Sequence, residues 1–424
     1  MSHHLRTQAQ ELFMAGVRAA DPEAITQRNV EARLDQITGH RLTIIATGKA
    51  SIPMMRGAMA ALSGHDVQKA ITVTNRENLT DLEGVMVLPA GHPVPDAQGA
   101  YAAQTIIDTV LALGAEDVLL FLVSGGTSAM LPAPAGDLTL DDEIAATQAL
   151  LASGAPIDAV NAVRGRLSRV KSGGLSRMAG AATLITLMLS DVPGDDPAVI
   201  GSGPTMEPEG AAPDISSIMA RYNLDTAFSG KVRAHVADAR PAPVAEMGAR
   251  DAAVICSNAI SLRTVSEAAA ALGYQVNVLS EWLDGDVEAA AHLFARQAQA
   301  ADRSRPMALI AGGETTVQLV GDGKGGRNQE LALRFALHSQ ELAGPWLFLS
   351  GGTDGRDGPT EAAGGHVDDT SVARIGDAAI RAALANNDAY HALAAGSDLL
   401  MTGGTGTNVA DLQLLLLPPV SADI

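Results

Sequence analysis

Apolar runs alternate along this chain with glycine-containing loops and with segments whose apolar residues recur at helical spacing. Six runs lead directly into a glycine loop: RLTIIATGKAS, VLLFLVSGGTSA, TLITLMLSDVPGDD, MALIAGGETT, WLFLSGGTDGRDG and DLLMTGGTGTN. Repeated strand, loop and helix patterns of this kind predict an α/β fold built on mainly parallel sheets. Ligands of such folds bind beyond the carboxyl ends of the strands. Each of these loops therefore lies where a binding site is expected.

A change of pattern near residues 239–251 divides the chain, because prolines interrupt the periodicity there before a new strand, AAVICSN. The 424 residues also exceed what one compact core usually holds. We therefore expect two α/β domains with mainly parallel sheets, residues 1–240 and 251–424. The N-terminal segment has helical spacing and could pack on either domain. The terminal run LQLLLL predicts a buried strand.

Composition narrows the classes of function. A net charge of -19 disfavours nucleic acid, whose binding needs a basic face. The single cysteine, Cys256, excludes an internal disulfide or a cysteine-ligated zinc site, and it is expected to be buried in a reducing compartment. The sequence has no apolar run of signal-peptide or membrane-spanning length. We expect a cytoplasmic protein with neither nucleic-acid nor membrane partners.

The stretch VQLVGDGKGGRNQELALRFAL, residues 317–337, allows three interpretations. It resembles strand, glycine turn and helix, and its glycines, Gly323 among them, have the G-x-G-x-x-G spacing of a dinucleotide site. However, Lys324 within the turn and Arg327 after it favour phosphoryl oxygens at a helix N-terminus. A glycine hairpin with solvated charges is the third interpretation. The two cations make a phosphate-binding turn the favoured one.

Charged residues also follow two of the predicted strands. Asp191 ends the strand TLITLML, where a carboxylate can ligate Mg²⁺ or accept a proton from a hydroxyl. Asp195 and Asp196 come soon after it, and either could instead cap the next helix. Lys49 follows the strand LTIIA, where its ammonium can reach a phosphate or carboxylate unless it is an ordinary surface lysine.

The loop LVSGGTSA offers small hydroxyl side chains and open backbone amides, which together form a plausible nest for an anion. Its residues are Ser124, Gly125, Gly126, Thr127 and Ser128. His92 in GHPVPD could line the substrate site or be structural, and Lys171 belongs to a basic helix that could bind an anion or be solvated. The chain lacks the Walker motif G-x-x-x-x-G-K-[ST] and the nucleophile elbow G-x-S-x-G. A P-loop fold and a serine hydrolase are therefore disfavoured.

Eight motifs in this order resemble the glycerate 2-kinase family: GKAS, GHPVPD, LVSGGTSA, NAVRGRLSRVKSGGL, LSDVPGDDPAVIGSGPT, GGETTVQLVGDGKGGRNQELAL, SGGTDGRDGPTEAAGG and TGGTGTNVADL. Members carry a C-terminal MOFRL domain and have often been labelled hydroxypyruvate reductases. The resemblance covers nearly the whole chain. It implies a Rossmann-like N-terminal domain, a MOFRL-containing C-terminal domain and an active site in the cleft between them. It further implies ATP- and Mg²⁺-dependent phosphorylation of D-glycerate to 2-phospho-D-glycerate.

The resemblance also carries site residues onto this chain. The family's catalytic lysine, aspartate and arginine fall on Lys49, Asp191 and Arg327, with Asp191 also the candidate metal ligand. Substrate or nucleotide contacts are expected, besides those named above, at Glu314, Gly323, Asn328, Asp354, Gly404 and Thr405. The family often has K-G-G where this chain has a serine after Lys171. This departure puts Lys171 in doubt as a ligand but does not alter the activity that the resemblance implies.

Two other functions stay open at this point. An NAD(P)H-dependent hydroxypyruvate reductase is favoured by the G-x-G-x-x-G spacing and by the older family label. A small-anion binding protein without catalysis would also use loops at strand ends. In each case the partners are small molecules, and the sequence leaves the oligomeric state open, a homo-oligomer included.

Overall fold

The computed structural model describes residues 2–208, 214–238 and 247–420. The chain forms two compact units, Pro22–Ile255 on the one hand and Met1–Asp21 with Cys256–Ile424 on the other. We call them the N-terminal unit and the C-terminal unit. The expected division at residues 239–251 lies partly outside the described residues, and the chain passes between the units at Ile255, within a strand.

The first 21 residues belong to the C-terminal unit, whereas the sequence analysis placed them in a domain of residues 1–240. Helix α1 (Ser2–Ala19) packs against α13 (Asn258–Ala271). The α1 side chains Leu12 and Phe13 are buried in a core that the C-terminal unit supplies. The helical spacing predicted the apolar face of α1 but could not indicate which core accepts it.

The N-terminal unit is built on a six-stranded sheet in the order β3, β2, β1, β4, β5, β6. The strands in that order are β3 (Met86–Ala90), β2 (Val67–Asn75), β1 (Arg41–Thr47), β4 (Asp117–Val123), β5 (Thr183–Leu189) and β6 (Arg250–Cys256). The pairs β1–β2, β1–β4, β2–β3 and β4–β5 are parallel, as expected. This is the strand order of a doubly wound sheet. From β1 to β3 the strands are added toward one edge, and from β4 onward they are added toward the other edge, so the order reverses between β1 and β4.

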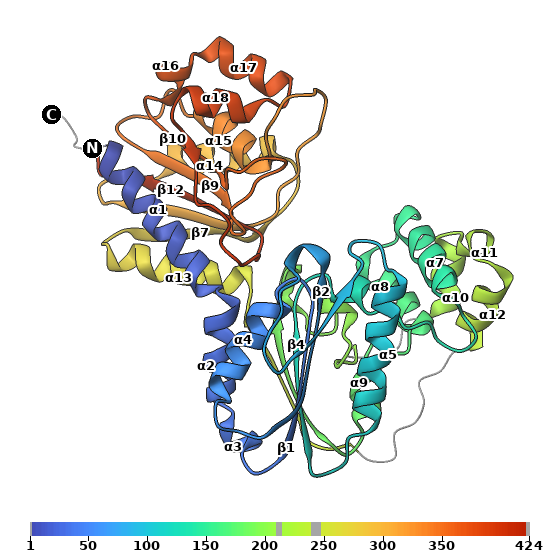
Figure 1. Cartoon of the computed structure of the whole chain (residues 1–424). Coiled ribbons are helices and arrows are strands. Elements are labelled where there is room, and N and C mark those ends of the chain that lie inside the picture. The colour runs from blue at the N-terminus through green and yellow to red at the C-terminus, as the bar shows by residue number, and fades with distance from the viewer. Residues whose placement is uncertain (1, 209–213, 239–246, 421–424) are drawn as a thin grey trace. The chain divides into compact units, whose positions relative to one another are not determined.

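Helices cover both faces of this sheet (Figure 1). The helices of the unit are α2 (Pro22–Glu31), α3 (Leu34–Ile37), α4 (Ser51–Ala61), α5 (Ala97–Leu111), α6 (Thr127–Met130), α7 (Leu140–Ala152), α8 (Ile157–Leu167), α9 (Gly174–Ala179), α10 (Ile215–Arg221), α11 (Leu224–Ala227) and α12 (Gly230–Asp238). Helices α5 and α9 bury one face, while α4, backed by α2, packs on the other. Helices α7, α8 and α10 to α12 enclose a small separate core.

The C-terminal unit has a second six-stranded sheet, in the order β11, β10, β9, β12, β8, β7. The strands in that order are β11 (Leu399–Leu400), β10 (Gly364–Asp368), β9 (Leu347–Gly352), β12 (Asp411–Leu417), β8 (Met307–Gly313) and β7 (Gln275–Leu283). Strands β7 and β8 are parallel, but the other four neighbouring pairs are antiparallel. The expectation of a mainly parallel sheet is therefore wrong for this unit, because β12 and β10 each run opposite to both of their neighbours.

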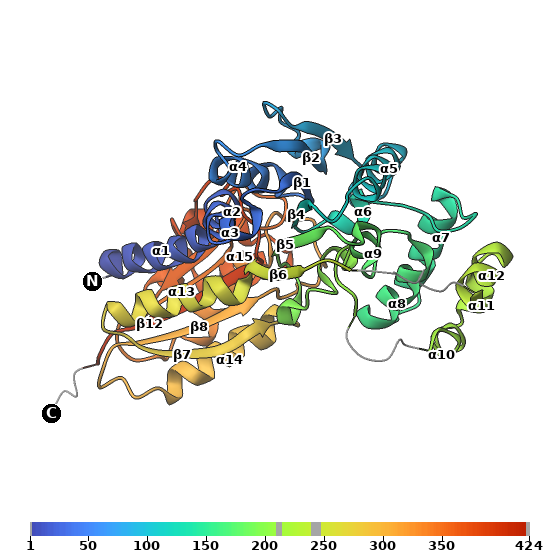
Figure 2. The same ribbon diagram turned by 90° about the horizontal axis from the view of Figure 1, so that it is seen from below.

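The predicted terminal strand is confirmed, since every residue of β12 is buried. The remaining helices of this unit are α14 (Val287–Ala300), α15 (Arg327–His338), α16 (Ser371–Ile375), α17 (Asp377–Ala385) and α18 (Ala389–Ala395). Helices α14, α15, α17 and α18 bury one face of the sheet around Phe294, Phe335 and Phe348. Helices α1 and α13 lie side by side on the other face (Figures 1 and 2).

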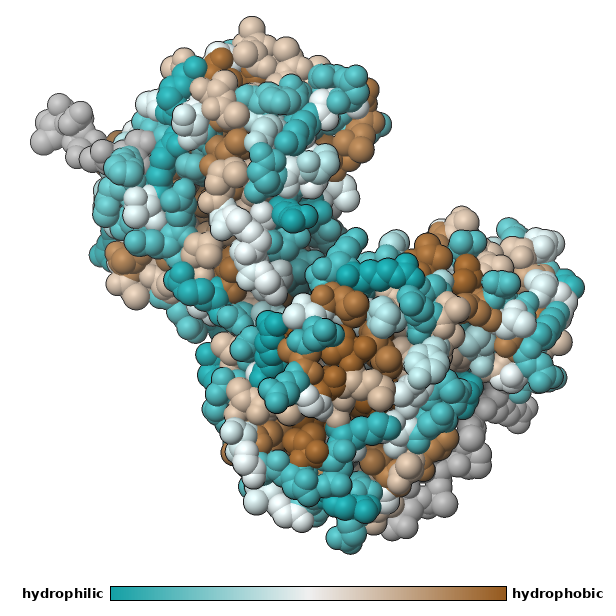
Figure 3. All heavy atoms as spheres, viewed as in Figure 1, coloured by the Kyte–Doolittle hydropathy of each residue, from teal (hydrophilic) through white to brown (hydrophobic). Residues whose placement is uncertain are grey.

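The surface is mainly polar on the face drawn in Figure 3. Apolar side chains gather there over part of the N-terminal unit. Exposed apolar side chains of that unit include Met86 and Val94, at 45% and 56% exposure. Cys256 is buried, as predicted. Among the helices that the structure describes, none is long and apolar enough to cross a bilayer.

The substitution Phe13→Ala should destabilise the C-terminal unit, although Phe13 lies near the start of the chain. Its side chain is fully buried, so its removal should lower the free energy of unfolding by about 3–5 kcal/mol. Both tryptophans, Trp282 and Trp346, belong to this unit, so denaturant unfolding followed by tryptophan fluorescence measures it selectively. The exposed Glu11→Ala on the same helix is the control. Equal unfolding curves for the two variants would contradict the assignment of α1.

Candidate active site

The loops after β1 and β4 meet at the point where the strand order of the sheet reverses. The backbone N–H of Lys49 donates to the carbonyl of Gly125 at 2.9 Å, and that of Ser124 donates to the carbonyl of Thr47 at 2.9 Å. The N–H of Ala50 donates to Oγ of Ser124 at 3.1 Å. Lys49 is exposed at this junction. The structure thus brings the predicted lysine beside the predicted hydroxyl loop.

Two glycines of this loop admit neighbouring side chains at close range. A Cβ on Gly125 would lie 2.1 Å from Oδ2 of Asp191, which places that carboxylate directly against the loop. Gly126 has φ +87°, and a Cβ there would lie 3.0 Å from Cδ2 of His92. Any larger residue would displace these side chains, so the approach requires glycine. Asp191 and His92 therefore join the same cluster.

His92 is half-buried in this cluster. Burial lowers the pKa of His92, the charge of Lys49 lowers it further, and Glu77 acts in the opposite direction. The imidazole is therefore neutral at neutral pH. It can contact a substrate through a hydrogen bond but adds no positive charge to the site.

The acidic residues after β5 differ in their surroundings. Asp191 is exposed against the hydroxyl loop. The carboxylate of Asp196 accepts a hydrogen bond from the N–H of Ala198 at 2.8 Å. This bond closes a local turn, but the next helical segment begins at Ile200 after Val199 and has no side-chain cap, so the capping alternative is wrong for Asp196. Asp191 is thus the carboxylate of this segment that meets the lysine loop.

Lys171 lies in the core behind the loop. Its Nζ is 2.6 Å from Oε1 of Glu143, and each side chain is only 4% exposed. Burial lowers the pKa of Lys171, while the charge of Glu143 opposes this shift. Next to the pair, Arg164 donates a hydrogen bond to Oγ of Ser128. The ammonium of Lys171 is therefore engaged within the fold, and its contact with a substrate stays a prediction.

In the C-terminal unit, the antiparallel direction of β12 places its first residue at the carboxyl ends of β8 and β9. Asp411 pairs in register with Gly313 and with Gly352, and its side chain is fully buried. Arg327, the first residue of α15, donates to the two carboxylate oxygens of Asp411 at 2.6 and 3.0 Å. Its Nη1 lies 2.9 Å from Oε1 of Glu314. A guanidinium group is thereby fixed at this edge of the sheet.

Asp411 is a site residue that the sequence analysis missed. The signal was an acidic residue between the glycine loop TGGTGTN and the apolar strand. It stands at the start of its strand, and only an antiparallel strand brings its start to the carboxyl edge of its neighbours. Burial acts to lower the pKa of Arg327, but hydrogen bonding and charge from Asp411 and the charge of Glu314 raise it above its ordinary value. Arg327 is therefore always cationic.

A second acidic side chain caps α15. The carboxylate of Asp357 accepts from the N–H groups of Asn328 and Gln329 at 3.2 and 2.8 Å. The Asn328 side chain accepts from Oγ of Ser350 at 2.5 Å and is buried, so the predicted contact of Asn328 with a ligand stays a prediction. Burial, together with the charge of Asp411, raises the pKa of Asp357 to about 7. The cap thus titrates close to neutral pH.

The glycine motif differs from its prediction, since the described residues 317–320 form no strand before it. Its backbone N–H groups also have partners inside the protein. Those of Val320 and Gly321 donate to Asn387, those of Asp322 and Gly323 donate to Asn386, and that of Lys324 donates to Asp388. The donors that a pyrophosphate would need at these five positions are occupied. A strand, turn and helix site for a dinucleotide is therefore absent from this stretch.

Lys324 is engaged as well. Its Nζ lies 3.1 Å from Oε2 of Glu361 and 4.1 Å from the ring centre of Tyr390, a cation–π contact. Of the two cations that favoured a phosphate-binding turn, Lys324 therefore stabilises its own loop through Glu361 and Tyr390. Arg327 remains the cation at the edge of the sheet.

The loops that carry Asp354 and Thr405 lie against each other. The N–H of Thr405 donates to the carbonyl of Asp354 at 3.3 Å, and its Oγ1 donates to that of Thr353 at 2.5 Å. The carboxylate of Asp354 accepts from the N–H of Arg356 at 2.9 Å, and Gly404 is exposed. The structure thus brings these predicted residues together in one loop pair.

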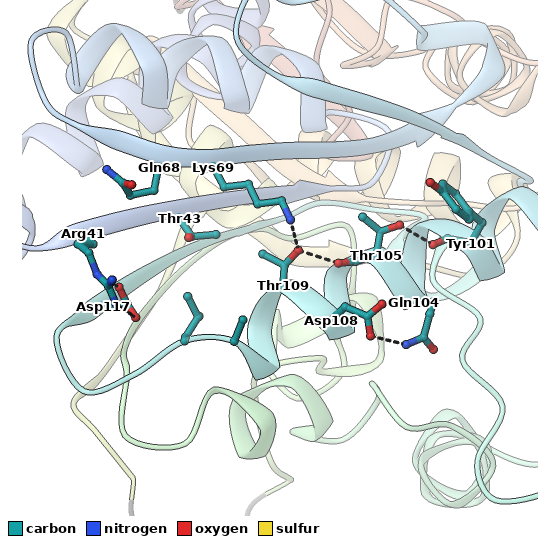
Figure 4. A pocket seen from close by; sticks show the side chains of 12 residues that line it. Arg41, Thr43, Gln68, Lys69, Tyr101, Gln104, Thr105, Asp108, Thr109 and Asp117 are labelled. Atoms are coloured by element: carbon teal, nitrogen blue, oxygen red, sulfur yellow. Dashed lines mark hydrogen bonds and ion pairs between the residues drawn. The ribbon is translucent and has the colours of Figure 1, made fainter.

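A pocket of about 580 Å³ opens elsewhere in the N-terminal unit (Figure 4). It lies where β1, β2 and β4 begin, at the amino edge of the sheet, and none of the predicted site residues lines it. Its cations already have partners, since Arg41 lies 2.8 Å from Asp117 and Lys69 donates to Thr109 at 2.8 Å. Ligands of parallel sheets bind at the opposite edge, so we do not place the active site here.

Each unit thus gathers polar groups at the carboxyl edge of its sheet. The N-terminal unit presents an ammonium, a carboxylate and a loop of hydroxyls and amides. The C-terminal unit presents a fixed guanidinium flanked by acidic groups. Cations together with a carboxylate suit chemistry on anionic phosphoryl or carboxylate groups.

Comparison with known proteins finds similarity along nearly the whole chain. Residues 8–237 match a family described as a domain of unknown function (DUF4147), and residues 307–411 match the MOFRL family. A Thermotoga maritima protein named D-glycerate 2-kinase is 34% identical over 425 residues, 97% of this chain and 98% of its own. An Agrobacterium vitis protein named "Putative hydroxypyruvate reductase" is 38% identical over 415 residues, 96% of this chain and 93% of its own. The crystal structure of a Thermotoga maritima glycerate kinase has a TM-score of 0.88 at 32% identity and covers 98% of this chain and 100% of its own.

The raised pKa of Asp357 predicts a specific dependence of stability on pH. A carboxyl whose pKa rises on folding binds its proton more tightly in the native state. Its contribution to stability is therefore complete below its ordinary value of 3.8 and is lost as the pH rises through about 7. This loss amounts to at most about 4 kcal/mol.

The substitution Asp357→Asn removes the titration and retains a capping oxygen. The free energy of unfolding of the wild type minus that of Asp357→Asn should fall between pH 4 and about 7 and stay constant above. Urea unfolding followed by tryptophan fluorescence across this range measures it. Asp322→Asn, at an exposed position of the same unit, gives the background. A difference that is constant with pH, or that rises, would contradict the raised pKa of Asp357.

Proposed function

Because the chain belongs to the glycerate kinase family with a MOFRL domain, we propose that it transfers the γ-phosphoryl group of ATP to the 2-hydroxyl of D-glycerate. The enzyme is a phosphotransferase with an alcohol group as acceptor. The observation that carries the proposal is Arg327, which buried Asp411 fixes at the carboxyl edge of the sheet. The side chain of Arg327 nevertheless remains 32% exposed.

Arg327 is suited to neutralise the transferring phosphoryl group, since phosphoryl transfer needs mainly alignment and charge stabilisation. Its Nε and Nη2 are bound to Asp411 at the rear. Its Nη1 meets Glu314, whose side chain is 49% exposed. A phosphoryl oxygen could replace the Glu314 carboxylate without moving the guanidinium. Asp411 would then act as the positioning residue for Arg327. Glu314 would occupy the place of the phosphoryl oxygen on the guanidinium while no substrate is bound.

Lys49 and the loop from Ser124 to Ser128 would bind the other anionic group, either the glycerate carboxylate or a nucleotide phosphate. The ammonium of Lys49 is exposed, and its backbone is tied to the loop by the bond to Gly125. Neutral His92 lies against Gly126 and can add a hydrogen bond without adding charge. Lys49 would supply the positive charge, and the hydroxyl and amide groups of the loop would orient the bound anion.

Asp191 would either hold Mg²⁺ or accept the proton of the glycerate hydroxyl. The donor type fits Mg²⁺, which takes one or two carboxylates together with phosphate oxygens and water. The carboxylate is exposed and lies where a Cβ at Gly125 would clash with it, so the loop leaves room for this group. When bound, Mg²⁺ would neutralise charge on the phosphates.

The reductase alternative rests on the G-x-G-x-x-G spacing and on the name of the Agrobacterium vitis relative. Nicotinamide binding through G-x-G-x-x-G needs a strand before the motif and open amides within it. In this chain the described residues before the motif form no strand, and five amides are occupied. The kinase is therefore the better supported of the two. Measurable turnover would exclude the third candidate, a binding protein without catalysis.

Incubation of the purified protein with D-glycerate, ATP and Mg²⁺ should give 2-phosphoglycerate, read by phosphorus NMR. A parallel tube with hydroxypyruvate and NADH should show no loss of NADH absorbance, because residues 317–324 lack the strand and the open amides of a dinucleotide motif. Loss of NADH without a phosphorylated product would reverse the assignment. Formation of 3-phosphoglycerate would retain the kinase and correct the position of transfer.

Arg327→Ala should lower kcat on the order of a hundredfold or more, because a charged contact to the transition state is lost. Lys324→Ala is the matched control, since it removes the other cation of the same motif, which is paired with Glu361. Its kcat should stay near that of the wild type. Steady-state kinetics with ATP and D-glycerate measure both, and tryptophan fluorescence checks the fold. A variant Arg327→Ala with normal turnover would remove Arg327 from the mechanism.

A further inference from the structure

Three side chains with metal-ligand chemistry meet on α14 and α15, outside the residues assigned to phosphoryl transfer. Glu288 and His292 lie four residues apart on α14 and therefore share a helix face. His338 is the last residue of α15. Oε1 of Glu288 lies 2.8 Å from Nε2 of His338 and 3.2 Å from Nε2 of His292. Ligand atoms of all three residues lie within 4.8 Å of one another.

Neighbouring groups hold this arrangement in place. The rings of His292 and His338 are stacked, with centroids 3.9 Å apart and planes inclined by 29°. Arg334 binds the other oxygen of Glu288, Oε2, at 2.5 Å, which leaves Oε1 to the two imidazoles. Arg334 is also paired with Glu330 at 3.1 Å, so one guanidinium serves two carboxylates.

We propose that Glu288, His292 and His338 form a binding site for Zn²⁺ or a similar transition-metal cation. Two imidazole nitrogens and one carboxylate oxygen are a ligand set that zinc accepts, and three protein ligands leave a position for water. Glu288 and His338 border a surface pocket of about 330 Å³, which gives that water room. Imidazole ligands select Zn²⁺ over Mg²⁺, so this site differs from the one proposed at Asp191.

The site would join the end of α15 to α14 within the same unit. Arg327 stands at the start of α15 and His338 at its end. A metal ion bound there would hold the helix that positions Arg327, without contacting the reacting groups. Since a ligand that binds the native state stabilises it by mass action, Zn²⁺ should raise the melting temperature of the wild type.

Titration of the full chain with ZnCl₂ in a calorimeter tests the proposal. The wild type should bind one Zn²⁺ tightly, and MgCl₂ should not compete for it. Loss of a group that only orients a ligand weakens metal binding about 10–100-fold, so His292→Ala, His338→Ala and Glu288→Gln should each weaken it by at least about that factor. His391→Ala is the matched control, an exposed histidine paired with Asp388. His3→Ala with His4→Ala controls for the adjacent histidines near the N-terminus.

Unchanged affinity in the three cluster variants would overturn the proposal, as would loss of binding only in the variant of His3 and His4. His292 is 49% exposed, so its substitution should preserve the fold, which tryptophan fluorescence verifies. The wild type gives a second measurement that needs no variant. Addition of Co²⁺ should produce visible absorption bands of a tetrahedral site, and Zn²⁺ should abolish them. A spectrum identical to that of hydrated Co²⁺ would also contradict the site.

Discussion

The bidentate pair between Arg327 and Asp411 is the interaction on which the rest of the C-terminal unit depends. A fully buried carboxylate without a partner is strongly unfavourable. Asp411 can therefore begin a central strand only because α15 begins beside it with an arginine. Asp357 in turn caps the first turn of that helix. Hydrogen bonds thus join the start of β12 to the start of α15 and its cap Asp357. The exposed side of this arrangement is the candidate site.

Much of the N-terminal unit could be predicted from the sequence because its signals are local. Apolar runs that end in glycine predict strands followed by turns, and alternation with helices predicts parallel order. The parallel sheet then requires the loops carrying Lys49 and Ser124 to lie at one edge. The contact between them needed no information beyond strand order. The residues of the two units that we assign to catalysis remain predictions until turnover is measured.

The features that escaped prediction depend on partners distant in sequence. The glycine motif has the spacing of a dinucleotide turn, but Asn386, Asn387 and Asp388 bind its amides from more than sixty residues away. The direction of β12 leaves no mark in its own apolar run, so the position of Asp411 could not be inferred. For α1 the spacing predicted a buried face but not which core receives it. In each case a local pattern is compatible with several tertiary partners.

The path of the chain through the two units has a consequence for folding during synthesis. Residues 22–255 form one continuous unit, set between α1 and the remainder of the C-terminal unit. The N-terminal unit can therefore fold as soon as it leaves the ribosome, because all of its strands have then been made. The C-terminal unit lacks its inner strand β12 until residue 417 emerges. Helix α1 precedes the N-terminal unit in the chain, so it is made before the core that buries Leu12 and Phe13.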